Sequence, residues 1–214
     1  YINTMGLVDK KRDNCDYTRK CFRELTEGML NLKRKKDIIR IFQRQIRDLL
    51  DGNVDTKDLV ITKKIGESYA AAKPAHVICA EKIIERGDAI QYHVNDRIPY
   101  VHIDVEDRIQ NLNRPMTKEP PLHEMTEGYE YALERECPIN YLRYASNVCM
   151  GPLLDTMALV VEDPLDIVRD IILEYDTKTD PKYWIPNWFR INWHSKKEDV
   201  KSKESREKIK KLFG

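Results

Sequence analysis

Two β-branched runs with a helical pattern between them, all within residues 59–104, constrain the fold of this chain more than any other feature. Leu59–Thr62 and Ile98–Ile103 are short apolar runs bounded by charges or turn residues, so each predicts a strand. Pro74 can open a helix, because a first turn does not use its missing N–H, and Gly87 can end one. The stretch therefore predicts a strand, a helix and a strand.

The predicted helix has one apolar face. Its inward positions at helical spacing are Val77, Ala80, Ile83 and Ile84. Pro99 cannot donate to a ladder, so it is expected at a sheet edge or near the start of the second strand.

Cations and aromatic hydroxyls gather at the joints of this unit. They are Lys63, Lys64, Lys73 and Arg97, with Tyr69 and Tyr100 beside them. Such cations on a rigid frame suit a phosphate backbone, and hydroxyls add positioning bonds. Ordinary surface charge is the plainer alternative for the pattern alone. His76, near the helix start, fits a phosphate contact or a partly buried helix histidine equally well.

Helical patterns precede the unit. Residues 17–32 and 37–51 carry apolar stripes and are predicted to pack as an antiparallel pair, with Gly52 past the end of the second helix. The first stripe consists of Phe22, Leu25, Met29 and Leu32. The basic connector 33–36 is predicted to be a solvated loop rather than a binding site.

The remainder of the chain is predicted to be mostly helical. Residues 107–123 form an Asn- and Pro-rich loop, and residues 124–136 an acidic helix. Pro138 is expected to open a long helix kinked at Gly151-Pro152, and Asp163-Pro164 to start another. Two further features complete the description. An aromatic-rich segment at 177–194 is predicted to be a packed flap rather than a base-stacking surface, and residues 195–214 form a charge-dense tail.

Charge is unevenly distributed along the 214 residues. The net charge is +6 for residues 1–64, −1 for 65–103, −10 for 104–176 and +6 for 177–214. A chain that bound DNA with its whole surface would not carry the acidic block. One face is therefore predicted to meet a polyanion, while another meets solvent or a protein.

Several classes of protein and site are not indicated. Hydrophobic residues make up 41% and charged residues 34%, as in a soluble globular protein, and no apolar run approaches the ~20 residues of a membrane helix. The sequence begins without the apolar segment of a signal peptide. The five cysteines form no CxxC pair, so they are predicted to be reduced, as in an intracellular protein. No structural metal is predicted, because cysteines and histidines do not recur at zinc spacing. No catalytic motif is found, and no catalytic residue is assigned.

Four blocks of sequence, in the same order, resemble family B DNA polymerases, particularly the delta catalytic subunit and its relatives in large DNA viruses. The first block is Gly6-Leu7 with Lys11–Cys15, and the second runs from Leu59–Lys63 through Tyr69 and Lys73 to Ala80-Glu81. The third is Asp96–Val101, and the fourth joins Pro138–Tyr141 to Pro152–Leu154. The resemblance covers about residues 5–160 and ends there.

The resemblance implies an α+β, predominantly helical fold, a polymerase thumb-like helical domain with a small β element. Residues 1–16 would be the C-terminal end of the palm, 17–194 the thumb and 195–214 the tail. The thumb would grip primer–template duplex through the sugar–phosphate backbone without reading sequence. The implied DNA contacts are Lys11, Arg12, Lys63, Lys64, Tyr69, Lys73, His76, Arg97 and Tyr100. The palm aspartates of such an enzyme, which bind Mg²⁺, are absent, so no cofactor is expected in this segment.

The sequence departs from the family pattern in two places. Met5 stands where a lysine is usual, and Val94-Asn95 replaces the glycine expected before Asp96, so that turn is expected to differ. At the C-terminus, Arg206, Ile209, Leu212 and Phe213 have the spacing of a sliding-clamp peptide, with arginine in place of the usual glutamine. Ile209, Leu212 and Phe213 are the candidate clamp contacts.

Two functions from different classes follow. The first is the thumb region of a replicative DNA-directed DNA polymerase, a nucleotidyltransferase acting in the nucleus or at a viral replication site. The alternative is a non-catalytic helical protein-interaction module that docks a partner through its acidic segment at 104–176. The two differ in whether duplex binding depends on salt and on the lysines of the central unit.

Overall fold

The computed structural model of the chain describes residues 8–69, 73–87, 92–104, 121–168 and 171. In chain order its elements are η1 (Val8–Lys10), α1 (Asp16–Leu30), α2 (Lys35–Leu50), η2 (Thr56–Leu59), β1 (Ile61–Lys64), α3 (Ala75–Glu85), β2 (Arg97–His102), β3 (Thr126–Gly128), α5 (Tyr129–Glu134), α6 (Tyr141–Arg143), η3 (Tyr144–Cys149) and α7 (Met150–Met157). The elements η1 and η2 are 3-10 helices, whereas η3 is a π-helix.

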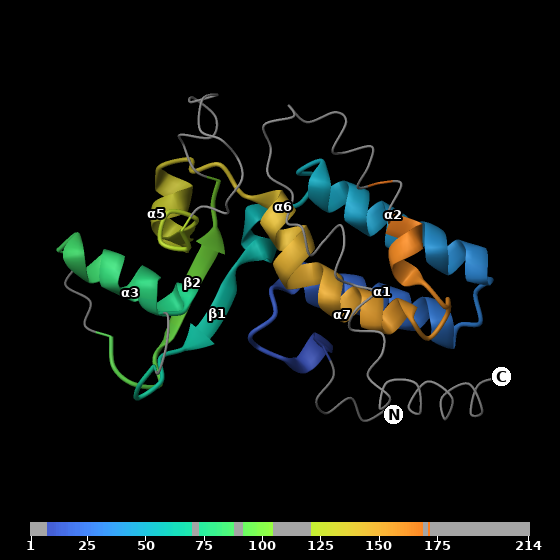
Figure 1. Cartoon of the computed structure of the whole chain (residues 1–214), viewed down its shortest axis with the longest axis horizontal. Coiled ribbons are helices and arrows are strands. Elements are labelled where there is room, and N and C mark those ends of the chain that lie inside the picture. Colours follow the sequence, from blue (N-terminus) through green and yellow to red (C-terminus); the bar gives the residue numbers. More distant parts are fainter. Residues whose placement is uncertain (1–7, 70–72, 88–91, 105–120, 169–170, 172–214) are drawn as a thin grey trace.

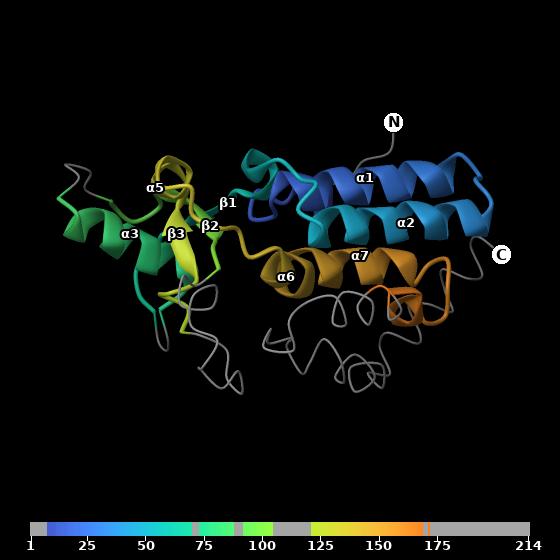
Figure 2. The same cartoon turned by 90° about the horizontal axis from the view of Figure 1, so that it is seen from above.

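The elements form two groups along the long axis of the molecule (Figure 1). A sheet group contains β1, β2, β3, α3 and α5, and a helical group contains α1, α2, α6, η3 and α7 (Figure 2). Buried apolar residues of both groups, such as Tyr100 and Tyr144, belong to one continuous core cluster. The groove described below therefore lies between parts that share a core.

The helices α1 and α2 pack as the predicted antiparallel pair. The Tyr17 hydroxyl, near the start of α1, donates to the Gln45 carbonyl near the end of α2 at 2.5 Å. At the other end, Gly28 leaves room for Ile38 and Ile41, which would lie 3.7–3.8 Å from a Cβ there. Phe42, at the centre of the pair, is fully buried. Both ends of the pair are thus fixed by contacts between the helices.

Two details of this pair differ from expectation, and one agrees. Leu32, assigned to the inner stripe, is 90% exposed, because α1 ends at Leu30 and Leu32 has a φ of 51° in the connecting turn. Lys35 and Lys36, assigned to the connector, begin α2 instead. The predicted end of α2 is confirmed, since Gly52 follows it with a φ of 73°.

The three strands form an antiparallel sheet in the order β1-β2-β3. The predicted strand–helix–strand order is confirmed, but β1 starts at Ile61 rather than Leu59. The reason is the 3-10 helix η2, which Asp55 caps by accepting from the Lys57 N–H at 3.0 Å. The strand β2 is central, yet Pro99 pairs only with Thr62 of β1, because β3 pairs with β2 from Tyr100 onward. The missing N–H of Pro99 therefore interrupts no hydrogen bond between β2 and β3.

The helix α3 begins after Pro74 and ends before Gly87, as predicted. Its buried face comprises Ala75, His76, Cys79 and Ala80. The prediction that Ile84 faces inward is wrong, because this side chain is 51% exposed.

The turn leading to β2 contains Asn95, which adopts a φ of 77°, a conformation that asparagine tolerates better than most residues. It thereby replaces the glycine expected there.

The predicted acidic helix at 124–136 is wrong at its start. Residues Thr126–Gly128 form β3, which pairs with β2, and only Tyr129–Glu134 are helical. Glu127 lies in the sheet and is 3% exposed, because Lys82 of α3 and Arg86, which follows that helix, neutralise it. Local charge predicted a solvated helix, whereas tertiary pairing made a strand.

The predicted long helix after Pro138 is present with different bounds. It begins at Tyr141, where the Asn140 side chain accepts from the Arg143 N–H at 2.9 Å. The π-helix η3 precedes α7, and Pro152 lies in the first turn of α7. A π-turn before a proline gives the ring space and is a known cause of helix bending. The structure thus has a π-turn just before Gly151-Pro152, where a kink was predicted.

Residues 164–168 and 171 are helical, and Val168 and Ile171 are buried as predicted. The predictions for residues 105–120, for 177–194 and for the C-terminal tail with its clamp candidates lie outside the described residues. Within the described part of the chain, no helix is both long and apolar enough to cross a membrane. The five cysteines form no disulfide with one another.

Candidate nucleic-acid interface

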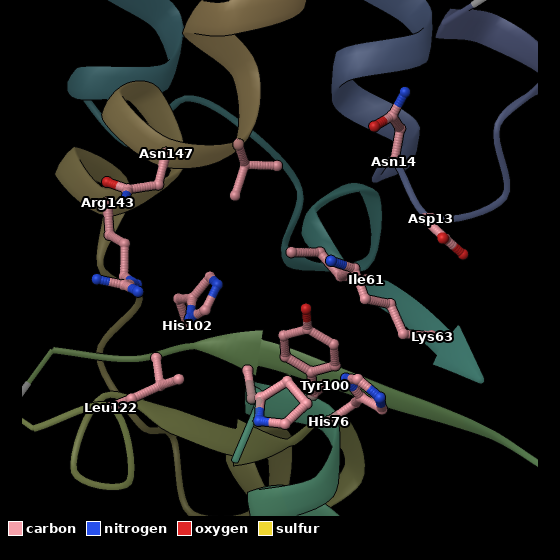
Figure 3. Close-up of a pocket in the computed structure, with 13 residues that line it drawn as sticks. Asp13, Asn14, Ile61, Lys63, His76, Tyr100, His102, Leu122, Arg143 and Asn147 are labelled. Carbon is pink, nitrogen blue, oxygen red and sulfur yellow. The ribbon is translucent and has the colours of Figure 1, made fainter. Parts of the chain in front are cut away.

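Two adjoining hollows open where the sheet group meets the helical group. The first encloses about 330 Å³ and is lined by Asp13, Asn14, Ile61, Lys63, Pro74, Ala75, His76, Tyr100, His102, Leu122, Arg143, Asn147 and Val148 (Figure 3). The second encloses about 340 Å³ and is lined by Asp13, Lys63, Lys64, Gly66, Tyr69, His76 and Arg97. They share Asp13, Lys63 and His76, and together they are called the basic groove below.

The register of the sheet explains which side chains face the first hollow. Ile61 pairs with Tyr100, and side chains two residues apart on a strand share a face. Lys63 of β1 and His102 of β2 therefore lie on the same face as this pair, and all four line the first hollow. Figure 3 shows the Tyr100 hydroxyl pointing toward the middle of the hollow.

The structure brings six of the nine predicted DNA contacts into the basic groove. They are Lys63, Lys64, Tyr69, His76, Arg97 and Tyr100. Lys73 lies outside it and pairs with Glu81 at 2.6 Å. Lys11 and Arg12 are exposed in the turn before α1, next to Asp13 in sequence, but they do not line either hollow.

The cations of the groove differ in how they are engaged. Arg97 pairs with Asp13 at 2.8 Å and also donates to the Thr62 carbonyl. Lys63 and Lys64, by contrast, form no ion pair with a described residue. Two unengaged ammonium groups on neighbouring positions of one rigid strand are suited to a ligand that carries negative charge.

A tyrosine–histidine pair lines the second hollow, and its histidine lines the first hollow as well. The Gly66 N–H donates to the Tyr69 hydroxyl oxygen at 2.5 Å, and that oxygen lies 3.1 Å from His76 Nε2. Burial, with the Lys63 charge as a second cause, lowers the pKa of His76, while the nearby backbone of Lys64 opposes the shift. His76 is therefore neutral at pH 7, and the positive charge of the groove comes from its lysines and arginines.

His102 is the most strongly perturbed histidine of the groove. It is 5% exposed and lies edge-on to the rings of Tyr100 and Tyr144. Burial, together with the Arg143 charge, lowers the pKa of His102 to about 3. The imidazole is thus a neutral part of the lining at any physiological pH.

Acid is expected to destabilise the fold through His102. The unfolded chain binds a proton there near pH 6.5, whereas the folded chain binds it only near pH 3, so stability is complete above pH 6.5 and falls as the pH drops below it. Between pH 7 and pH 5, protonation of His102 in the unfolded chain is expected to lower the free energy of unfolding by about 2 kcal/mol. Urea denaturation of wild type and His102→Gln at both pH values measures it, because the variant lacks this part of the pH dependence.

His123→Gln is the matched control for this measurement. The His123 side chain is 64% exposed, so its removal leaves the pH dependence unchanged. Equal pH dependence in wild type and His102→Gln would contradict the assignment.

Sequence reasoning missed Arg143 and Asn147, which reach the first hollow from α6 and η3. Their spacing of four residues was the available signal, because such residues share one side of a helix. Their phase, however, depends on where the helix begins and on the π-turn, which the sequence did not reveal. Among the described residues, no group of three or more histidine, cysteine or acidic side chains is placed to hold a metal ion.

Comparison with known proteins agrees with this architecture. A sequence model of DNA polymerase family B matches residues 2–159. The DNA polymerase delta catalytic subunit of Oryza sativa subsp. japonica is 33% identical over 156 residues, which cover 72% of this chain and 13% of that protein. A DNA polymerase of Pyramimonas orientalis virus is 27% identical over 159 residues, covering 74% of this chain and 12% of that protein. The chain thus spans a small part of the length of these relatives.

A solved structure has a similar fold. The family B DNA polymerase from the hyperthermophilic archaeon Pyrobaculum calidifontis superposes with a TM-score of 0.51 at 14% identity. The superposition covers 66% of this chain and 17% of that one. At this level of identity the likeness concerns the fold alone.

Proposed function

The chain belongs to DNA polymerase family B, and from that premise we propose that it is the thumb region of a replicative DNA polymerase. In this proposal the basic groove holds primer–template duplex through its sugar–phosphate backbone. The observation that carries it is the position of Lys63 and Lys64, which line the groove without an ion pair to any described residue. Contacts to phosphate give affinity without sequence preference, as copying of any template requires.

The proposal assigns a place to each part of the chain. Residues 1–16 would be the end of the palm, 17–194 the thumb and 195–214 a tail that reaches a sliding clamp through Ile209, Leu212 and Phe213. The parent polymerase would act with Mg²⁺ in the nucleus or at a viral replication site. The resemblance implies that this metal would be bound by palm aspartates outside the present segment.

Binding of the chain to a primer–template duplex as salt is raised tests the proposal. We expect the logarithm of the association constant to fall linearly with the logarithm of salt concentration, with a slope near −0.9 for each phosphate neutralised. Two or more contacts would give a slope of about −2 or steeper. Fluorescence anisotropy with two duplexes of unrelated sequence measures the slope and the lack of sequence preference. Absence of binding at 50 mM salt, or a flat salt dependence, contradicts the proposal.

One observation favours the alternative, an interaction module. On α5, Leu133 is 58% exposed, and the acidic residues Glu130, Glu134 and Glu136 near it are exposed as well. An exposed apolar side chain with three exposed carboxylates and one arginine near it in sequence fits a basic protein partner better than a nucleic acid. If duplex binding is absent in the salt titration, this surface becomes the leading candidate for the chain's function.

A further inference from the structure

We infer that the start of α3 and the Tyr100 hydroxyl form a seat for one phosphate-type oxyanion in the first hollow. The groups of this oxyanion seat are the backbone N–H groups of Ala75 and His76, the Tyr100 hydroxyl and the Lys63 ammonium. The inference rests on the proposed function only for the source of the ligand, a DNA phosphodiester. Free phosphate has the same chemistry and is the other source.

The start of α3 supplies donors without acceptors. Pro74 is its N-cap residue and has no side chain that could cap it. The N–H groups of Val77 and Ile78 bond to the Pro74 carbonyl, whereas those of Ala75 and His76 have no acceptor among the described residues. The first turn also contains no acidic side chain. An 11-residue helix with such an end carries partial positive charge there, which favours an anion.

The Tyr100 hydroxyl is the second, independent observation. Tyr100 is 3% exposed, yet its hydroxyl makes no hydrogen bond with any described residue. The ring is buried in the core, whereas the hydroxyl oxygen keeps accessible surface on the hollow and can therefore reach a ligand there. Here the hydroxyl points into the first hollow (Figure 3). A bound oxygen atom would give it an acceptor.

The protonation state of Tyr100 suits this role. Burial raises the pKa of the phenol, with nearby Cys79 as a further cause. The hydroxyl therefore keeps its proton throughout the physiological range. It can donate this proton in a hydrogen bond to an oxygen atom of an anion.

Charge in the hollow favours an oxyanion over a neutral ligand. Lys63 brings to the lining an ammonium group without an ion pair to a described residue, against one carboxylate among the described lining residues, that of Asp13. Asp13 is already paired with Arg97, which offsets its repulsion of an anion. Several N–H and O–H donors around one ammonium group match the several oxygens of a phosphate.

Tyr100→Phe is the sharpest test, because it removes one oxygen atom and leaves the ring in the core. Affinity is measured by titrating the chain with inorganic phosphate, or with a short DNA duplex, and following the backbone amide signals of Ala75 and His76 by NMR. We expect phosphate to shift both signals in wild type, and the variant to bind phosphate and duplex about five- to tenfold more weakly. Its midpoint of urea unfolding is expected to stay unchanged or rise, because the hydroxyl has no described protein partner.

Tyr144→Phe is the matched control. The Tyr144 hydroxyl accepts from the His102 N–H at 3.0 Å and so has a structural role. Its removal is expected to lower the midpoint of unfolding and to leave the phosphate affinity of the folded protein within about twofold of wild type. The two variants remove the same atom from the same residue type, and only the seat predicts opposite outcomes for them.

Three results would overturn the seat. They are unchanged phosphate affinity in Tyr100→Phe, amide shifts confined to residues away from Ala75 and His76, and a loss of stability in Tyr100→Phe equal to that in Tyr144→Phe. If the variant binds duplex as wild type does while neutral replacements of Lys63 and Lys64 weaken binding, the seat fails and the proposed function stands. If phosphate binds with the expected sensitivity but duplex neither binds nor displaces it, the seat holds free phosphate and the proposed function fails.

Discussion

Replacing Lys63 and Lys64 together by glutamine is expected to weaken duplex binding by about 30- to 100-fold near 0.1 M salt. Each lysine that neutralises a phosphate releases a counterion, so the salt slope should also become shallower by about 1 per lysine, or 2 in all. Both side chains line the basic groove without an ion pair to a described residue, and their full charge is therefore available to the DNA. Anisotropy titrations at four salt concentrations give the affinity and the slope together.

The matched control removes two lysines that are already engaged. Lys20 pairs with Asp58 at 2.6 Å and Lys57 with Asp55 at 2.7 Å, and neither lines the groove. Lys20→Gln/Lys57→Gln changes the net charge equally and is expected to bind within about threefold of wild type. Equal weakening in both double variants would show that net charge, and not the groove, governs binding.

The second large effect is expected on stability, from Glu127→Gln. The Glu127 carboxylate is buried between α3 and β3, where Arg86 donates to both of its oxygens at 2.7 and 2.9 Å and the Gly128 N–H donates at 2.9 Å. Breaking a buried pair leaves the remaining cations without their partner. The full cost of ~3–5 kcal/mol is reduced here because Arg86 and Lys82 are 30% and 22% exposed, so we expect a loss of about 2–3 kcal/mol of unfolding free energy at pH 7.

The pH dependence gives this prediction a second measurement. Burial raises the pKa of Glu127, but the bonds from Arg86 and Gly128 and the Lys82 charge outweigh it and lower the pKa below its usual value. The contribution is therefore complete above pH ~4.5 and is lost as the pH falls through the lower pKa of the folded state. Urea denaturation at pH 7 and pH 4 should show wild type and variant converging at the acidic end.

Glu134→Gln on α5 serves as the control for Glu127→Gln. Glu134 is exposed, and the change is expected to alter the unfolding free energy by no more than about 0.5 kcal/mol. A loss below 1 kcal/mol in Glu127→Gln would contradict the view that this carboxylate fixes α3 to the sheet.

The elements that were predicted well carry strong local signals. Pro74 and Gly87 punctuate α3, and the antiparallel pair α1 and α2 has long stripes and a turn glycine at its end. The failures occurred where distant residues decided the outcome. Glu127 became part of a strand because Arg86 and Lys82 neutralise it, and η3 has a π-turn that no local pattern revealed.

The same distinction applies to the basic groove. Lys63, His76, Arg97 and Tyr100 sit on the strand–helix–strand unit, whose order follows from local pattern, so their proximity could be anticipated although the register of the strands was not predicted. The engagement of Lys73 by Glu81 could not, because it depends on the rotamers of two exposed side chains. Arg143 and Asn147 could not either, since a helix from another part of the chain brings them to the hollow.

The central position of β2 has a consequence for how this surface tolerates change. Neighbouring side chains on a strand alternate between faces, so a displacement of β2 by a single residue would exchange Tyr100 and His102 for Pro99 and Val101. The polar side of the first hollow would become apolar with little change in the path of the backbone. Hydrogen bonds to β1 and β3 on the two sides of β2 hold its register. Mutations that weaken either pairing are therefore expected to reduce ligand binding in the groove without changing a residue that lines it.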